Sequence, residues 1–266
     1  MQQDFNDRAC QSFVVGVIIW PIARGSSYTS QPDVSIMLPA SEATFVLSIP
    51  AILVGAAPTD LAGIDLCKPD WPVFAADGGV HTALLHHCRP RAVIGDMDSI
   101  GELYDPDNAI EKVHLCGQDD TDFEKSLRVI DAPMIVCFGF LGARSDHMLA
   151  VLHALATLTD RRPIVLVGQH DVMLRVRGDC AFDLPLSTRF SLWPLGRQCF
   201  VRSKGLAWPV DGLTMQIGKQ SGTSNHVSET RVVIEAGPGD GYMVILPPDC
   251  LPALLRTASK ISGISL

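Results

Sequence analysis

Between residues 44 and 176, short apolar runs alternate with amphipathic segments, and this alternation limits the folds open to the chain. The apolar runs end at or beside a glycine, and they are 45–55, 72–79, 91–96, 133–142 and 162–168. The segments between them have helical character, as in 121–130, where Phe123, Leu127 and Ile130 recur at helical spacing. Strands that alternate with helices predict a parallel sheet covered by helices, with functional residues at the carboxyl ends of the strands.

The helical period disappears after about residue 177. Short β-branched or aromatic runs follow, separated by Gly, Pro, Asn and Asp. This pattern predicts a smaller antiparallel β-sandwich domain over 177–266, after the α/β domain over 44–176.

Residues 1–43 stand apart, because they end in the polar, turn-rich stretch 24–33. We expect an N-terminal extension or linker here. Met37 opens a segment that leads directly into the first strand, and the hypothesis that it is the true start is tested by the N-terminal mass of the native protein.

Composition narrows the range of partners. The formal net charge is −8 and no Lys/Arg run is present, so the sequence predicts no nucleic-acid partner, although a basic pocket for a small phosphorylated ligand remains possible. No apolar run reaches the ~18 residues of a membrane span, which predicts no membrane partner. The eight cysteines form no CxxC pair. Free thiols fit a reducing compartment, and we expect a cytoplasmic protein.

Acidic or polar clusters follow several predicted strands and precede two predicted helices. They are ADGG (76–79), GDMDS (95–99), QDDTD (118–122) and GARSDH (142–147). A single Asp at a strand end is more often a turn residue than a ligand. Several carboxylates at one edge of a sheet are unfavourable unless a cation lies between them.

The GDMDS cluster is the strongest candidate for a metal site. On an extended chain alternate residues point the same way, so Asp96 and Asp98 can share one cation. Carboxylate oxygens suit Mg²⁺, which often bridges substrate phosphates. A basic side chain or solvent on a surface turn are the alternatives.

QDDTD precedes a helix. Thr121 and Glu124 form a T-x-x-E capping box, which makes Thr121 the predicted N-cap and places Asp122 in the first turn. Lys125 follows on the same face. Asp122 can complete a metal site and Lys125 can contact a phosphate. Alternatively, Asp122 only complements the helix dipole.

GARSDH also opens a helix, with Ser145 as the predicted N-cap. Free N–H groups at a helix start bind anions, and Arg144 beside them can donate two hydrogen bonds to a phosphate. His147 is a possible general base, although a structural histidine is favoured. No P-loop motif is present, and GPGDG (237–241) is predicted to be a hairpin turn.

Two polar segments stand out in the second domain. Trp208 precedes a proline in a turn-rich stretch and can offer a flat face to an aromatic or cationic ligand. Thr223, Ser224 and Asn225 add hydroxyl and amide groups. A core tryptophan beside a polar loop is the alternative.

Taken in order, the motifs ADGG, GDMDSI, QDDTDFEKSL, G-x-x-G-A-R-x-D-H, GLAWPVDG and TSN resemble the thiamine pyrophosphokinase family, from about residue 50 to the C-terminus. The resemblance implies a Rossmann-like catalytic domain followed by a β-sandwich domain. It implies transfer of a pyrophosphoryl group from ATP to the hydroxyl of thiamine, giving thiamine diphosphate and AMP. It also implies a homodimer with shared active sites.

The resemblance assigns roles to residues of this sequence. It implies that Asp96, Asp98 and Asp122 are catalytic ligands of Mg²⁺. A second set would form the nucleotide cleft or contact ATP: Asp77, Gly78, Gly79, Gln118, Lys125, Arg144 and Asp146. Trp208 would stack on the aminopyrimidine of thiamine in the partner subunit's site, with polar contacts from Ser224 and Asn225. The general base stays open between Asp98, Asp122 and late deprotonation.

The sequence departs from the family pattern at three positions. Ala143 stands where the family has a glycine. Gly222 stands where the family often has a serine, and Val151 where it often has an asparagine. Alanine at 143 would be strained if the backbone there needs a positive φ. The alternatives are a non-catalytic protein that binds thiamine or thiamine diphosphate, and a DxD-type Mg²⁺-dependent enzyme that acts on another nucleotide or alcohol.

Overall fold

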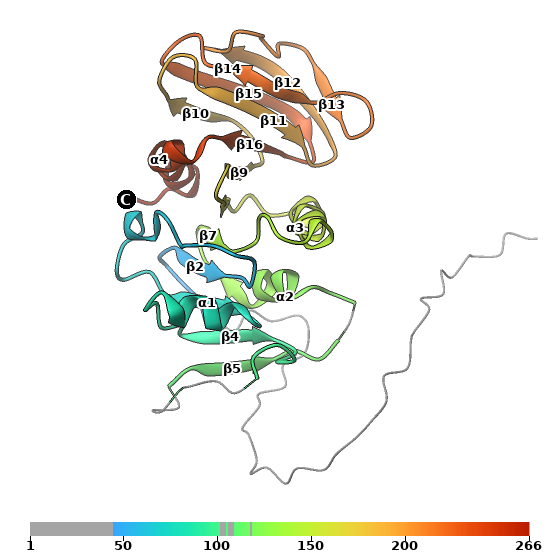
Figure 1. Ribbon diagram of the computed structural model, residues 1–266. Helices are drawn as coiled ribbons and strands as arrows, with labels where there is room; N and C mark the ends of the chain where they lie inside the picture. The colour runs from blue at the N-terminus through green and yellow to red at the C-terminus, as the bar shows by residue number, and fades with distance from the viewer. Residues whose placement is uncertain (1–44, 102–104, 106–108, 118, 266) are drawn as a thin grey trace, which may run out of the picture. The chain divides into compact units, whose positions relative to one another are not determined.

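The computed structural model describes residues 45–101, 105, 109–117 and 119–265 (Figure 1). The predicted extension 1–43, with Met37, lies outside the described residues, as does Gln118. The described strands form a ten-stranded sheet, a four-stranded sheet and a two-stranded sheet. The ten-stranded sheet has the order β14-β11-β16-β9-β8-β7-β2-β3-β4-β5.

One part of the large sheet is parallel, as predicted. Its strands, in spatial order, are β8 (Ile164–Val167), β7 (Ile135–Phe138), β2 (Ala51–Val54), β3 (Val73–Ala76), β4 (Ala92–Gly95) and β5 (Glu111–His114). The predicted run 45–55 is divided, because β1 (Phe45–Val46) leaves this sheet and pairs with β6 (Ile130–Asp131).

Side chains of the parallel strands alternate between two cores. In β2, Ile52 and Val54 belong to one core and Ala51 and Leu53 to the other, as the two-residue period of a strand requires. The helices α2 (Asp122–Val129) and α3 (Ser145–Thr157) pack in the second core, whereas α1 (Gly79–Leu85) packs on the opposite face. The result is a sheet with helices on both faces.

The other half of the sheet is antiparallel. It consists of β9 (Val172–Val176), β16 (Tyr242–Leu246), β11 (Arg189–Pro194) and β14 (Gly222–His226). The four-stranded sheet packs on it and consists of β10 (Cys180–Asp183), β15 (Arg231–Gly239), β12 (Arg197–Lys204) and β13 (Thr214–Gln216).

Aromatic pairs join the two sheets of this sandwich. The rings of Phe182 and Phe190 lie 5.6 Å apart, and those of Phe200 and Tyr242 5.1 Å apart. The predicted fold class, a parallel-sheet α/β unit followed by an antiparallel sandwich, is therefore confirmed. The boundary at 176/177 stays a prediction, because β9 pairs with both β8 and β16 and carries the large sheet across it.

The interpretation that the helical period disappears after about residue 177 is wrong for the C-terminal segment. Helix α4 (Leu251–Ser262) follows the 3-10 turn η2 (Pro248–Cys250), and a second 3-10 turn, η1, spans Ile64–Leu66. α4 has a proline, Pro252, in its first turn and ends at Gly263 in the left-handed conformation, which are ordinary helix boundary signals. In Figure 1 it lies beside β10, and its Leu and Ala side chains fill the first core.

The prediction of a hairpin at GPGDG is also wrong. The segment begins within the end of β15 and leads into β16, and these two strands lie in different sheets, so the chain crosses here from one layer of the sandwich to the other. Asp240 fixes the corner by accepting a hydrogen bond from the backbone N–H of Arg197. Within the described residues no helix is long and apolar enough to span a membrane.

Candidate active site

The parallel strand order reverses between β2 and β7, and this is where a doubly wound sheet opens a crevice. Gly55 follows β2 and Gly139 follows β7. The two backbones approach so closely that a Cβ on either glycine would lie 2.5 Å from the carbonyl oxygen of the other. Gly139 also has φ +73°. Only glycine fits this contact, which shapes the opening of the crevice.

A cleft of about 560 Å³ occupies this position. Its wall comes from the ends of four parallel strands and from the starts of α2 and α3. Among the lining residues are Asp77, Gly78, Asp96, Asp122, Lys125 and Arg144. The structure therefore gathers most of the candidate nucleotide and metal residues in one cleft, as the position at strand ends predicted.

Three carboxylates meet in the cleft. Oxygens of Asp77, Asp96 and Asp122 all lie within 4.8 Å of one another. Asp77 follows β3, Asp96 follows β4, and Asp122 begins α2. The convergence of distant acidic residues at one edge of the sheet is thus observed within the described part of the chain.

Asp98 is not in this group, and the reasoning that paired it with Asp96 is wrong. Met97 has φ 67°, which is left-handed, so the chain turns after Asp96 instead of staying extended. Asp98 is exposed, and its backbone N–H donates to a carboxylate oxygen of Asp96 over 3.2 Å. The third carboxylate of the cluster is that of Asp77, for which we predicted only a place in the nucleotide cleft.

Two glycines allow the cluster to form. A Cβ on Gly95 would lie 3.0 Å from both Asp122 Oδ1 and the Cβ of Asp77. A Cβ on Gly79, the first residue of α1, would lie 2.1 Å from the carbonyl oxygen of Val54. Gly79 thus lets α1 start directly against β2, which holds the Asp77 turn over the crevice.

The start of α2 is fixed as predicted. Thr121 is the N-cap, and a complete capping box joins it to Glu124. Asp122 therefore stands in the first turn, and Lys125, which is 3% exposed, places its Nζ 3.0 Å from Asp122 Oδ1. The same Nζ lies 3.8 Å from Asp96 Oδ2. Lys125 is thus held by carboxylates in this structure.

Burial is the largest effect on Asp122 and raises the pKa of its carboxyl group, and the neighbouring Asp96 and Asp77 raise it further. Lys125 acts in the opposite direction without cancelling the increase. Three carboxylates and one ammonium group leave about two negative charges in the cleft, and oxygen ligands suit a hard divalent cation. The donor set therefore fits Mg²⁺.

The raised pKa of Asp122 predicts how stability depends on pH. A folded state that holds a proton more tightly than the unfolded state loses that advantage as pH rises through the raised pKa. We expect the Tm of Asp122→Asn, measured in chelator, to rise relative to that of wild type as the pH increases from about 4, the ordinary pKa of an aspartate. Thermal unfolding across this range measures the difference, and a difference independent of pH would contradict the prediction. Asp65→Asn, at an exposed site, is the control.

Helix α3 begins one residue earlier than predicted. Arg144 is the N-cap residue and Ser145 is already helical, so the prediction of Ser145 as N-cap is wrong. No side chain caps this helix start. Arg144 donates to both carboxylate oxygens of Asp146, over 3.1 and 2.6 Å, and this pairing lowers the pKa of Asp146 to about 2. The pair is exposed, so it can open to take an anionic ligand.

Ala143, which replaces the glycine of the resembled motif, has φ 53°. The expected strain is therefore present. The left-handed conformation costs a non-glycine residue about 1–2 kcal/mol. Glycine avoids this cost, but it loses more conformational entropy on folding, which offsets part of the gain. We predict that Ala143→Gly raises the free energy of unfolding by about 1 kcal/mol, measured by urea denaturation. Ala156→Gly, inside α3, should lower it by about the same amount, and equal losses in both variants would contradict the prediction.

The second group of candidate residues lies in the sandwich. Trp208 is 59% exposed, so it is not a core tryptophan. Thr223 and Ser224 are exposed on β14, and their side chains are available to a ligand. Asn225 is 5% exposed, and both ends of its amide bond to the backbone of Trp208.

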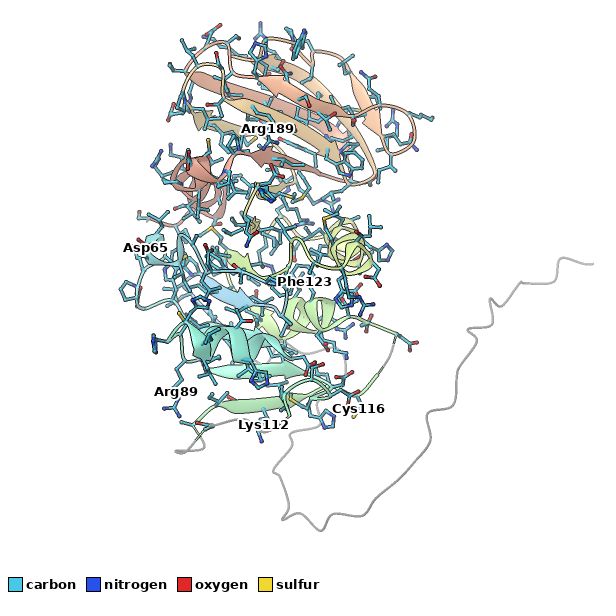
Figure 2. The ribbon with its side chains drawn as sticks, viewed as in Figure 1. Asp65, Arg89, Lys112, Cys116, Phe123 and Arg189 are labelled. Carbon is cyan, nitrogen blue, oxygen red and sulfur yellow. The ribbon has the colours of Figure 1, made fainter. Side chains whose placement is uncertain are left out.

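Some lining residues of the cleft were not predicted. Phe140 and Phe123 pack at 4.8 Å between ring centres, and Phe123, labelled in Figure 2, belongs to the first turn of α2. Ser99 and Val151 also line the cleft. Apolar and small residues of this kind carry no chemical signature in a sequence. The available signals were the position of Ser99 and Phe123 within the acidic motifs and the position of Val151 where the resembled family often has asparagine.

Comparison with known proteins extends these observations. The family model for the catalytic domain of thiamin pyrophosphokinase matches residues 65–167, and the model for its vitamin B1 binding domain matches 182–238. Thiamin pyrophosphokinase 1 of Caenorhabditis elegans is 30% identical over 180 residues, which cover 61% of this chain and 74% of that protein.

Solved structures show the same fold. Thiamin pyrophosphokinase from Geobacillus thermodenitrificans has a TM-score of 0.63 at 22% identity, covering 75% of this chain and 97% of that one. The enzyme from Candida albicans has a TM-score of 0.63 at 17% identity, covering 82% and 97%.

The catalytic-domain match falls on the parallel sheet that carries the acidic cleft. The sheet, the cleft and this match together define an enzyme of the kinase class, a transferase. The second match falls on the sandwich that carries Trp208. The chain belongs to the thiamin pyrophosphokinase family, as the sequence motifs indicated.

Proposed function

We propose that this chain transfers a diphosphate group from ATP to thiamine and forms thiamine diphosphate and AMP. In this reaction the hydroxyl oxygen of thiamine bonds to the β-phosphorus while the bond from that phosphorus to the α,β-bridging oxygen breaks. AMP leaves, and the hydroxyl proton is released. The observation that carries the proposal is the three-carboxylate cluster at the carboxyl ends of β3 and β4, in a cleft large enough for a nucleotide.

The cluster supports a bound Mg²⁺. Asp96 and Asp122 would hold the ion, with Asp77 as the third carboxylate that the geometry supplies. Asp98 remains a proposed ligand, and the Met97 turn would have to change before it could join the others. When bound, Mg²⁺ neutralises and orients the polyphosphate.

Cationic and backbone groups around the cluster suit the rest of ATP. Arg144 can leave the exposed pair with Asp146 and donate two hydrogen bonds to a phosphate. Lys125 keeps the like charges of the cluster together and adds a positive charge beside the phosphates. Gly78 lines the cleft beside Asp77, and Gly79 starts α1 there. Gln118 stays a proposed contact.

Thiamine would bind at the exposed face of Trp208, with Thr223 and Ser224 nearby on β14. A cation over an indole face is attracted by the ring, and thiamine carries a positive charge. The homodimer, in which Trp208 serves the partner's site, belongs to this proposal. So does a cytoplasmic location, which suits the seven described cysteines as free thiols.

Release of AMP tests the proposal. Purified protein with ATP, Mg²⁺ and thiamine should form AMP and thiamine diphosphate in equal amounts, and omission of thiamine should stop both. AMP formed without thiamine would identify a hydrolase. Thiamine binding without AMP release would identify a binding protein, and turnover only with another alcohol would identify a different acceptor.

A further inference from the structure

We propose that Asn225 and Ser191 are positioning residues that hold Trp208 in place for thiamine, and that Asn225 does not itself contact the ligand. The inference rests on the proposed function for its substrate. Trp208 is largely exposed and precedes Pro209, so neither core packing nor a regular strand fixes its orientation.

The backbone before Trp208 is held by the end of β14. Leu206 and Val227 form an antiparallel bridge, and the N–H of Ala207 donates to the carbonyl of His226 over 2.9 Å. This pairing of backbone with backbone ends at Ala207. The next residue, Trp208, finds its partners on a side chain.

The amide of Asn225 takes the place of a peptide group at that point. Its Oδ1 accepts from the Trp208 N–H over 3.1 Å, and its Nδ2 donates to the Trp208 carbonyl over 2.7 Å. The same Oδ1 accepts from the N–H of His226 over 2.8 Å. A buried amide with both ends bonded fixes the tryptophan backbone in one position.

A bulge in β14 aims Asn225 inward. Phe190 pairs with Asn225 and Leu192 with Gly222, so two residues, Thr223 and Ser224, oppose Ser191 alone. Extra residues of this kind change the direction in which neighbouring side chains point. The alternation is broken so that Thr223 and Ser224 are both exposed while Asn225 is buried.

Ser191 holds this bulge. Its Oγ accepts from the N–H of Ser224 over 3.0 Å, and Ser224 has φ 62°, a left-handed conformation that a serine rarely adopts. Ser191 is 4% exposed, so we expect it to affect a ligand at Trp208 through its hydrogen bond to β14 and not by direct contact. Without its hydroxyl, the N–H of Ser224 would lose its partner and the bulge its anchor.

The indole ring has a support of its own. The rings of Trp208 and His226 meet edge to face with centres 5.0 Å apart. His226 follows Asn225 directly, so the bulge that directs the amide also sets the place of this ring. Trp208 is thus held in three ways: Ser191 anchors the bulge, Asn225 bonds to the tryptophan backbone, and His226 packs against the indole ring.

The test compares Asn225→Asp and Ser191→Ala with Ser259→Ala. Asn225→Asp removes the N–H that donates to Trp208 while keeping the shape of the side chain. Ser259 is also 4% exposed, and its hydroxyl donates a hydrogen bond to the carbonyl of Ile264. Ser259→Ala is therefore the matched control, because it removes a buried serine hydroxyl whose hydrogen bond lies away from Trp208 and β14. We expect kcat/KM for thiamine to fall about tenfold in the two test variants, with KM for ATP within about twofold of wild type.

A readout without ligand separates this inference from the proposed function. In protein labelled with 5-fluorotryptophan, the Trp208 resonance, assigned by Trp208→Phe, should shift or broaden in both test variants and stay unchanged in Ser259→Ala. An unchanged Trp208 resonance, or equal changes in the kinetics of thiamine and ATP, would overturn the inference. Failure of the wild-type protein to form thiamine diphosphate would instead refute the proposed function, and the fluorine spectra would still decide whether Trp208 is held as described.

Discussion

Asp96→Asn is expected to lower turnover on the order of 10³-fold while thiamine binding stays nearly unchanged. The substitution keeps the size of the side chain and removes one of three charges that meet within 4.8 Å. Phosphoryl transfer depends on positioning and charge neutralisation, so the loss appears in kcat more than in thiamine affinity. Initial rates of AMP release and thiamine titration measure the two effects separately.

The control for this prediction is Asp65→Asn. Asp65 lies in η1 and is exposed, outside the residues that line the cleft. This variant removes the same charge and should keep full activity. An Asp96→Asn protein with full activity would remove Asp96 from the mechanism. A comparable loss in Asp65→Asn would mean that net charge matters and the site does not.

The second large effect is expected for Trp208→Ala. A desolvated cation over an indole face contributes about 2 kcal/mol, which corresponds to a rise of about 30-fold in KM for thiamine. KM for ATP should stay unchanged because Trp208 is not among the residues that line the acidic cleft. Steady-state kinetics with each substrate varied in turn measures this difference.

Trp208→Phe is the matched variant, since it keeps an aromatic face with a weaker attraction for a cation. We expect its KM for thiamine to lie between those of wild type and Trp208→Ala. If all three proteins had the same KM for thiamine, thiamine would not bind on Trp208. The proposed subsite would then have to lie elsewhere.

The alternation of strands and helices was readable from the sequence because each element has its own period and its own boundary signals. The capping box at Thr121 and Glu124 is local, so spacing alone predicted it correctly. The convergence of acidic motifs also followed from general rules, since parallel strands end at one edge of a sheet. The family resemblance pointed to the same part of the chain.

What the sequence could not supply is backbone direction at single residues. The turn at Met97 keeps Asp98 out of the cluster, and Asp77 is the third member. Hydrophobic periodicity does not predict that a methionine adopts a left-handed conformation. The bulge at Ser224 also contains a left-handed residue that the sequence pattern does not indicate. It turns Asn225, for which the family resemblance implies a ligand contact, toward the backbone of Trp208.

The sequence pattern also did not predict which segments pair with each other when they lie far apart in the chain. GPGDG has the composition of a hairpin turn, yet the two strands that it connects, β15 and β16, pair in different sheets. Helix α4 was missed because only Pro247 and the short turn η2 separate it from β16, and its apolar residues extend an already apolar stretch. Both errors concern which neighbour a segment packs against, and a linear pattern does not contain this information.

The central claim is that Asp77, Asp96 and Asp122 together hold one divalent ion against the polyphosphate of ATP. Crystals grown with Mn²⁺ and a non-hydrolysable ATP analogue test it through the anomalous scattering of manganese. The claim predicts a peak within coordination distance, about 2.2 Å, of oxygens from at least two of these carboxylates and from a phosphate. A peak bound elsewhere on the nucleotide, with the three carboxylates paired only to Lys125, would contradict it.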